Sequence, residues 1–243
     1  MELSINALIA EVTQGMSLTT RKRSFDFPLT RQQTSELLLQ AYKAQVASRG
    51  MQFTLDDAVR FYIGEFSGWL TDPSDKSFLM LSGGCGCGKT TLALAFRDMT
   101  NAICDKAYKA PEFLLKDKPA EVQRQYAQLA RFPRVSLKTA QEISDAARRS
   151  REDRTDKYYA IKRSAFLIID DLGCEPVEVK NFGTSVTPIT DIIYERYAAM
   201  KPTIITTNLD TRQIRTEYNE RVADRLNEIC RVIGYKNESY RKS

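Results

Sequence analysis

The segment 83–90 reads GGCGCGKT and has the spacing G-x-x-x-x-G-K-[ST]. A glycine-rich turn of this kind exposes successive backbone N–H groups, which bind phosphate oxygens at the start of a helix. In this pattern Lys89 reaches the β- and γ-phosphates of a nucleotide, and the Thr90 hydroxyl ligates Mg²⁺. The residues expected to contact the nucleotide are Gly83, Gly84, Cys85, Gly86, Cys87, Gly88, Lys89, Thr90 and Thr91.

The residues on either side of this segment have the order that a phosphate-binding loop requires. Residues 78–81 (FLML) are an apolar run typical of a buried parallel strand, and residues 91–96 (TLALAF) have helical apolar spacing. Strand, loop and helix therefore follow one another as in P-loop proteins. The alternative is a glycine-rich loop that binds no ligand.

A second apolar run ends in two acids. Residues 166–171 read FLIIDD, and a parallel strand delivers its last residues to the carboxyl edge of the sheet, where the P-loop also lies. We expect Asp170 to hold Mg²⁺ and Asp171 to orient or deprotonate an attacking water. Glutamate is more usual at this position, and the Asp171 side chain is one methylene shorter and reaches less far toward the water. One alternative is therefore a protein that binds ATP without hydrolysing it. Two acids that cap a strand without a chemical role are another.

Asn208 follows a further buried-type strand, residues 203–207 (TIITT). If that strand is central in the sheet, Asn208 emerges beside the γ-phosphate and can hydrogen-bond the phosphate or the attacking water. The alternative is a polar turn residue that caps the next helix, a position where asparagine is common.

The composition restricts both the protein class and the chemistry. The chain has 243 residues, 42% of them hydrophobic and 28% charged, as in soluble globular proteins. It has no histidine, so a general base must be a carboxylate, and a Ser-His or Cys-His nucleophile is excluded. Five cysteines without a C-x-x-C pair argue against a disulfide framework or a zinc site.

The chain also lacks the features of a membrane or exported protein. No apolar run approaches the roughly 20 residues that a membrane-spanning helix needs, and the start does not read as a signal peptide. We therefore expect a cytoplasmic protein. The net charge of +5 permits contact with nucleic acid without demonstrating it.

From residue 76 the sequence alternates strands with helices, which predicts a parallel sheet in a three-layer α/β sandwich. Before it, two predicted helices over residues 31–48 and 54–70 form a small helical N-terminal segment. We divide the chain into residues 1–60 and 61–243. The other predicted elements are a P-loop helix ending near 104, strands at 134–137 and 232–235, and helices from 139, at 188–200 and at 211–230.

Several segments resemble the AAA+ ATPases of the bacterial replicative-helicase loader family (DnaC/DnaI type). The resemblance covers about residues 76–243, and IstB-type transposition ATPases share the same pattern. Besides the P-loop, the matching segments are LIIDDLGCE (167–175), YERY (194–197), KPTIITTNL (201–209), NERVADRL (219–226) and the tail ESYR (238–241).

The resemblance implies an AAA+ P-loop NTPase that binds and hydrolyses ATP with Mg²⁺ and loads a replicative helicase onto DNA. Its members act as ATP-dependent homo-oligomers. It assigns Lys89 to the phosphates, Thr90 and Asp170 to Mg²⁺, Asp171 to the second acidic motif and Asn208 to the polar residue that senses the γ-phosphate.

An arginine finger that enters the site of a neighbouring subunit matches Arg225, and Arg221 one helical turn earlier is the competing choice. The alternative is that both arginines pair with Glu220 and Asp224 on a solvated helix face. Arg241 matches a sensor that acts within its own subunit.

Residues 146–163 contain seven basic and three acidic residues, together with Tyr158 and Tyr159. Basic groups beside an aromatic platform suit single-stranded DNA, and the alternative is a solvated helix with internal ion pairs. The polar and basic stretch 105–131 has no assigned role.

Two other functions remain open. A transposase helper of the IstB type would have the same ATPase core with a different partner, and the N-terminal segment that would decide between the partners matches no motif. A small-molecule P-loop kinase is the other, although it would usually carry an arginine-bearing lid.

Overall fold

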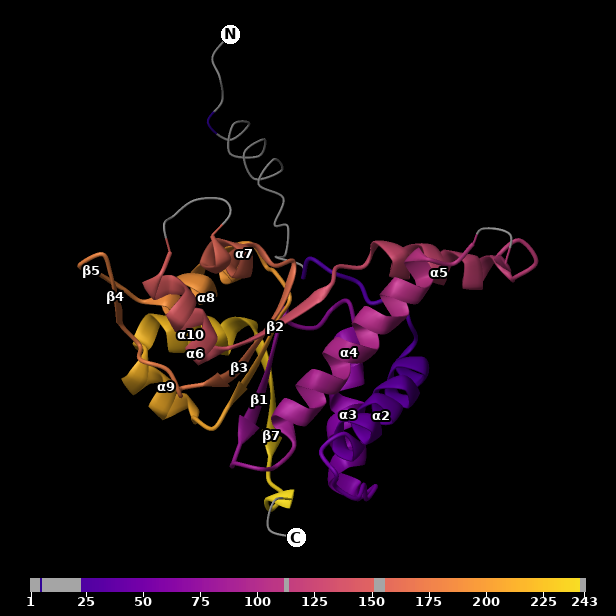
Figure 1. Cartoon of the computed structure of the whole chain (residues 1–243), viewed down its shortest axis with the longest axis horizontal. Helices are drawn as coiled ribbons and strands as arrows, with labels where there is room; N and C mark the ends of the chain where they lie inside the picture. Colours follow the sequence, from indigo (N-terminus) through magenta and orange to yellow (C-terminus); the bar gives the residue numbers. More distant parts are fainter. Residues whose placement is uncertain (1–4, 6–22, 112–113, 151–155, 241–243) are drawn as a thin grey trace.

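The computed structural model describes residue 5 and residues 23–111, 114–150 and 156–240. At its centre lies a five-stranded sheet in the order β2-β3-β6-β1-β7, in which every pairing is parallel (Figure 1). The strands are β1 (Phe78–Gly83), β2 (Val135–Thr139), β3 (Phe166–Leu172), β6 (Thr203–Thr207) and β7 (Cys230–Tyr235). This arrangement confirms the expected parallel α/β fold of a P-loop NTPase.

Helices cover both faces of the sheet, so the molecule has three layers (Figure 1). On one face lie α2 (Arg31–Ala47), α3 (Asp57–Thr71), α4 (Lys89–Tyr108) and α5 (Ala120–Arg131). On the other lie α6 (Ala140–Arg148), α7 (Lys157–Arg163), α8 (Pro188–Ala198), α9 (Thr211–Glu217) and α10 (Glu220–Ile229). A short hairpin, β4 (Val179–Asn181) and β5 (Thr184–Val186), lies outside the sheet and was not predicted.

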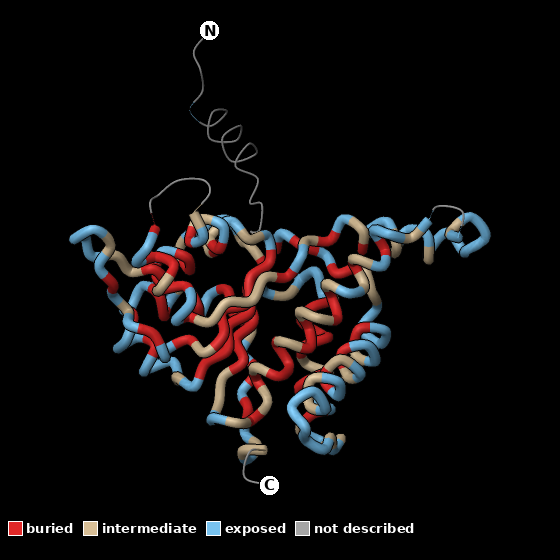
Figure 2. Tube along the Cα trace, viewed as in Figure 1, coloured by how far each residue is buried: buried red, intermediate tan, exposed pale blue. Residues whose placement is uncertain are grey.

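The central strands begin with or contain apolar runs because both faces of these strands are buried. In β1, Leu79 and Leu81 pack with the helices of one face, and Phe78 and Met80 pack with those of the other. Figure 2 shows buried residues concentrated along these strands. No helix in the described part of the chain is long and apolar enough to cross a bilayer.

The N-terminal helices α2 and α3 pack on the face of the sheet that carries the P-loop helix α4. The hydroxyl of Thr30 caps α2 by accepting from the Gln33 backbone N–H, and the Gln45 amide donates to Asp98 on α4 over 2.6 Å. The expected division after residue 60 falls within α3. Residues on both sides of that division share one hydrophobic cluster.

An aromatic cluster joins the segment before α2 to the sheet. The Phe25 ring lies 5.6 Å from Trp69 of α3 and 5.4 Å from Phe166 of β3, measured between centroids. Phe166 also lies 5.3 Å from Phe96 of α4. Tilted and edge-on aromatic pairs of this kind stabilise a core beyond the area they bury.

The single helix predicted over residues 211–230 is wrong, because the structure has two helices, α9 and α10, separated at Tyr218 and Asn219. The Tyr218 side chain is buried, and its hydroxyl donates to the Glu175 carboxylate. The Asn219 side chain accepts from the Val222 backbone N–H over 2.9 Å and caps α10. A buried tyrosine and an N-cap therefore interrupt an otherwise helical pattern.

Two further helix boundaries differ from the predictions. The P-loop helix α4 continues past Cys104 to Tyr108, and α5 occupies the end of the stretch 105–131. Helix α3 begins at Asp57 rather than Thr54, because Asp56 caps it by accepting from the Val59 backbone N–H over 2.7 Å.

Phe25→Ala is expected to lower the free energy of unfolding by about 3–5 kcal/mol, the usual cost of emptying a buried aromatic site. Urea denaturation followed by circular dichroism measures it. Phe182→Ala is the control, because Phe182 is 84% exposed and its loss should cost less than about 0.5 kcal/mol. Equal stability of the two variants would show that the segment before α2 does not belong to the core.

Candidate nucleotide-binding site

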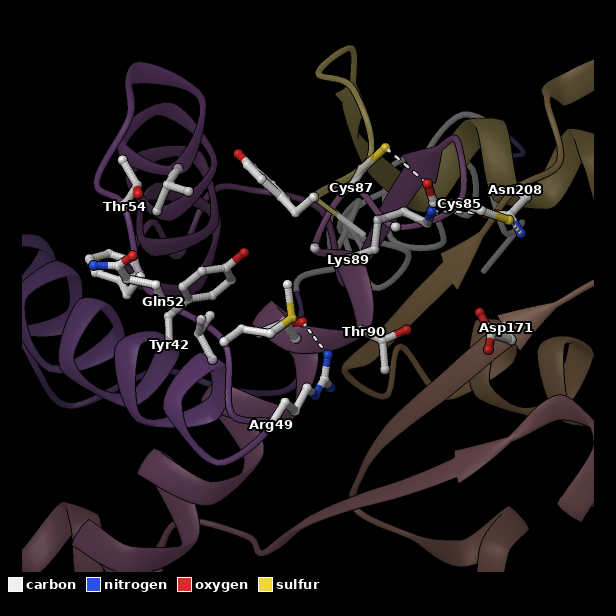
Figure 3. Close-up of a pocket in the computed structure, with 18 of the residues that line it drawn as sticks. Tyr42, Arg49, Gln52, Thr54, Cys85, Cys87, Lys89, Thr90, Asp171 and Asn208 are labelled. Carbon is white, nitrogen blue, oxygen red and sulfur yellow. Dashed lines mark hydrogen bonds between the residues drawn. The ribbon is translucent and has the colours of Figure 1, made fainter. Parts of the chain in front are cut away.

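A cavity of about 580 Å³ opens at the carboxyl edge of the sheet, beside the start of α4 (Figure 3). Residues 85–91 of the P-loop form one wall, and Asp171 and Asn208 lie at one end of it. Residues from α2, α3 and the loop between them form the opposite wall. Ligand pockets in proteins usually have volumes between roughly 300 and 1,000 Å³, so this cavity has the size that a nucleotide needs.

Close packing explains two of the P-loop glycines. Gly88 has φ +99°, and a β-carbon there would lie 2.5 Å from the hydroxyl oxygen of Tyr42 on α2. Gly83 has φ +151°, and a β-carbon there would lie 2.5 Å from the backbone oxygen of Tyr235 on β7. Both positions combine a backbone conformation that favours glycine with a neighbour that leaves no room for a side chain.

Lys89 lies under the P-loop with only 5% of its surface exposed. Its Nζ donates to the backbone oxygens of Gly83 (2.8 Å) and Gly84 (2.7 Å) and to Oδ1 of Asn208 (2.9 Å). Gly83 and Gly84 therefore contact Lys89 rather than the cavity. Burial lowers the pKa of the Lys89 ammonium, because a charged group loses solvation there.

Asp170 is buried at the end of β3, where one carboxylate oxygen accepts two hydroxyl hydrogen bonds. Thr90 donates to Oδ1 over 2.9 Å, and Thr206 of β6 donates to the same atom over 2.6 Å. Burial raises the pKa of the Asp170 carboxyl, and the hydrogen bond from Thr206 opposes that shift. The carboxylate is thus held by donors from two other elements.

The oxygens of Thr90 and Asp170 fit Mg²⁺. This ion prefers oxygen ligands and binds through one or two protein groups together with substrate phosphates and water. Within the described residues, no group of three or more His, Cys, Asp and Glu side chains could hold a metal ion. A hydroxyl and a single carboxylate beside a phosphate-binding loop are the donor set that agrees with Mg²⁺ rather than Zn²⁺.

Asp171 lines the cavity, whereas its neighbour Asp170 is buried behind Thr90. The Asp171 backbone has φ +55°, a left-handed conformation uncommon outside glycine, and its N–H donates to Oγ1 of Thr206 over 2.9 Å. Thr206 therefore positions both acids. Sequence reasoning missed Thr206, although it stands two residues before Asn208 in the same strand end.

Asn208 joins the end of β6 to the P-loop. Its Oδ1 accepts from Lys89, and its Nδ2 donates to Sγ of Cys85 over 3.3 Å. Because β6 is the central strand between β3 and β1, its end lies between the acids and the loop. The structure thus brings Lys89, Thr90, Asp170, Asp171 and Asn208 together at one edge of the sheet.

The opposite wall of the cavity was not predicted from the sequence. It is formed by Tyr42, Val46, Arg49, Met51, Gln52, Phe53, Thr54, Val59 and Tyr240. The Tyr240 hydroxyl donates to Asp56 over 2.8 Å, which links the C-terminal part of the chain to this wall. Tyr240 belongs to the matching tail 238–241, but the other wall residues form no local motif, so only the packing of α2 and α3 on α4 reveals them.

Arg225 does not line this cavity. Its guanidinium carbon lies 3.9 Å from the ring centroid of Tyr194 and 5.3 Å from that of Tyr197, both on α8. Its Nη1 is buried without a hydrogen-bond partner among the described residues. Arg221, the competing choice, is exposed.

In the alternative, Arg221 and Arg225 pair with Glu220 and Asp224. The structure does not show these pairs. Both acids lie near Arg215 of α9 instead, at nitrogen–oxygen distances of 3.9 Å for Glu220 and 3.4 Å for Asp224. These exposed contacts contribute little to stability.

The prediction that Tyr158 and Tyr159 together form an aromatic platform for single-stranded DNA is wrong. Tyr158 is buried, and its hydroxyl donates to the backbone oxygen of Pro188 over 3.1 Å, so its ring cannot stack on a base. Tyr159 is partly exposed, with Lys162 and Arg163 against its ring. Residues 151–155 of this segment and Arg241 lie outside the described residues.

The fold is shared with solved structures of replication proteins. The crystal structure of the DnaC helicase loader is 20% identical, with a TM-score of 0.51 over 76% of this chain and 94% of that one. The DnaI structure is 18% identical, with a TM-score of 0.50 over 82% of this chain and 92% of that one. The chain therefore shares the fold of these two structures.

Sequence comparison adds a partial similarity. The family model described as Nephrocystin 3, N-terminal matches residues 63–172, a segment that contains the P-loop and β3. No curated protein is similar to the chain in sequence. The relation to IstB-type ATPases stays a prediction.

Thr206→Val is expected to lower the free energy of unfolding by about 1–3 kcal/mol, because it leaves the buried Asp170 carboxylate and the Asp171 N–H each short of one partner. Urea denaturation measures the change. Thr184→Val is the matched control, since Thr184 is exposed on the β5 hairpin. If the two variants are equally stable, Thr206 does not hold the acids in place.

Proposed function

We propose that the protein binds ATP with Mg²⁺, hydrolyses it, and uses this cycle to load a replicative helicase onto DNA. The observation that carries the proposal is the meeting of Lys89 with Asn208, and of Thr90 with Asp170, at the mouth of a nucleotide-sized cavity. The AAA+ fold shared with the DnaC helicase loader supports the link to helicase loading.

The side chains around the P-loop have the chemistry for phosphoryl transfer to water. Lys89 would exchange the backbone oxygens of Gly83 and Gly84 for phosphate oxygens and neutralise their charge. Asn208, already on Lys89, would contact the γ-phosphate. Asp171, which faces the cavity, would orient the attacking water. Thr90 and Asp170 would hold Mg²⁺, which would supply positive charge beside the phosphates.

The wall formed by α2 and α3 supports a nucleoside rather than inorganic phosphate as the ligand. Its apolar side chains include Val46, Met51, Phe53 and Val59, which offer a surface for a flat base. Polar groups next to them, such as the Gln52 amide, can hydrogen-bond the edge of the base. The cavity therefore has an apolar end and a phosphate-binding end.

The position of Arg225 supports an assembly of several subunits. In its own chain Arg225 stacks on Tyr194 and does not reach the cavity. A finger held away from its own site can act only on the site of a neighbour, where it would stabilise charge on the transferred phosphoryl group. We therefore assign it to a homo-oligomer that forms with ATP. The resemblance to helicase loaders makes single-stranded DNA the ligand that we expect this assembly to bind.

Lys89→Ala and Arg225→Ala are each expected to reduce ATP turnover at least 100-fold, a range typical of losing one group that stabilises developing charge. Phosphate release is measured with Mg²⁺, with and without single-stranded DNA. Arg212→Ala is the control, because Arg212 is an exposed arginine on α9. Mixing the two inactive variants should restore part of the turnover, since one subunit supplies Lys89 and its neighbour supplies Arg225.

The outcomes separate the alternatives. No recovery on mixing would contradict a site shared between subunits. Binding of ATP without turnover in the wild-type protein would favour a module that only binds the nucleotide. Phosphoryl transfer to a nucleoside or metabolite, with no effect of DNA on turnover, would favour a kinase.

The partner is tested directly. With ATP and Mg²⁺, the full chain is expected to co-purify with the hexameric replicative helicase of its own organism and to increase the amount of helicase on circular single-stranded DNA. Lys89→Ala should retain less than half of this stimulation, because it cannot complete the nucleotide cycle. Selective co-purification with a transposase instead would contradict the loader function.

A further inference from the structure

Arg49 follows the end of α2 and is, with Lys89, one of two cations among the described residues that line the cavity. Its Nη1 donates to Oγ1 of Thr91 over 2.8 Å, an interaction drawn in Figure 3. Thr91 directly follows the expected Mg²⁺ ligand Thr90. The N-terminal helices thus place a guanidinium against the helix that begins the phosphate site.

Most of the donors of this guanidinium are uncommitted. Within the described residues, the Arg49 side chain forms no ion pair, and its single hydrogen bond goes to Thr91. The residue is exposed to the cavity side and to solvent. An arginine has five N–H donors in a planar fork, and that fork matches two oxygens of a phosphate group.

The position of Arg49 along the cavity distinguishes the phosphates that it can reach. In Figure 3 it lies between the N-terminal wall, marked by Tyr42, and Thr90, whereas Asp171 lies at the opposite end. The end of the cavity proposed for the γ-phosphate contains Lys89, Asn208 and Asp171. The phosphates nearest the nucleoside would then lie between the apolar wall and the start of α4, where Arg49 lies.

The charges that line the cavity leave a role for a second cation. Among the described lining residues, Lys89 and Arg49 face a single acid, Asp171. A nucleotide di- or triphosphate brings several negative charges into this space, and charge-assisted hydrogen bonds to an arginine are among the strongest that a protein can offer them.

We propose that Arg49 binds the inner phosphates, α and β, of the nucleotide held by the P-loop. The inference rests on the proposed function, because it requires a nucleotide in this cavity. It gives the helices before the P-loop a direct contact with the ligand. Helix α2 already contacts α4 through the hydrogen bond from Gln45 to Asp98. A bound nucleotide would add a second connection between α2 and the P-loop helix.

The test compares Arg49→Ala with Arg49→Lys and with Lys43→Ala. Lys43 is an exposed cation of α2 that does not line the cavity, so its loss controls for a general change in charge. Binding of ADP, ATP and adenosine to the full-length variants is measured by titration calorimetry in the presence of Mg²⁺. Thermal unfolding without nucleotide confirms that each variant is folded.

Arg49→Ala is expected to weaken the binding of ADP and of ATP by the same factor, about tenfold. This is the equivalent of one charge-assisted hydrogen bond. Arg49→Lys should lose less, because it keeps the charge but not the fork. Adenosine binding should not change, and Lys43→Ala should match the wild type.

Three results would overturn the inference: unchanged affinities for ADP and ATP, a loss confined to ATP, or an equal loss for adenosine. A loss confined to ATP would place Arg49 at the γ-phosphate, and an equal loss for adenosine would make it part of the wall only. If the wild-type protein binds neither ADP nor ATP, the proposed function itself fails, which is a separate result.

Discussion

The site depends on one buried carboxylate. Asp170 is almost inaccessible to water, and a charged group in that position is stable only when hydrogen-bond donors surround it. The hydroxyls of Thr90 and Thr206 supply them, so the P-loop helix, β3 and β6 meet at a single oxygen atom. The same Thr206 hydroxyl accepts from the Asp171 N–H and turns that acid toward the cavity. The order of the strands follows the same requirement, because β6 must lie between β3 and β1 for these contacts to form.

The helices before the P-loop complete the site rather than stand apart from it. Tyr42 lies so close to Gly88 that a side chain there would have to displace the Tyr42 hydroxyl. Aromatic contacts from Phe25 anchor the preceding segment on Trp69 and Phe166. Because α2 and α3 share their core with α4, a ligand between them acts on the packing of the whole face. Any partner that binds these helices would therefore be coupled to the nucleotide through shared contacts.

The sequence predicted those parts of the molecule in which local pattern determines structure. Some features can be read from short continuous segments: the buried strands, the glycine-rich loop and the acids at the end of β3. Their order along the chain predicted the parallel sheet and the edge at which the site lies. The break at Tyr218 was missed because it depends on a buried contact with Glu175, far away in sequence. The cavity wall was missed for the same reason. The prediction that Tyr158 stacks on DNA bases was wrong because its ring is buried in the core. Local composition does not reveal whether a tyrosine is buried.

In the proposed assembly, the contacts of Arg225 within its own chain would prepare it for the site of a neighbour. A free arginine side chain loses about 2 kcal/mol of rotamer freedom when it is fixed by a ligand. Contact with the rings of Tyr194 and Tyr197 restricts the guanidinium before any neighbour arrives, and a cation–π contact of this kind contributes about 0.5–2 kcal/mol. Association would then cost less entropy at this residue. In that assembly, the tyrosines of α8 would restrict the guanidinium of Arg225 through their rings.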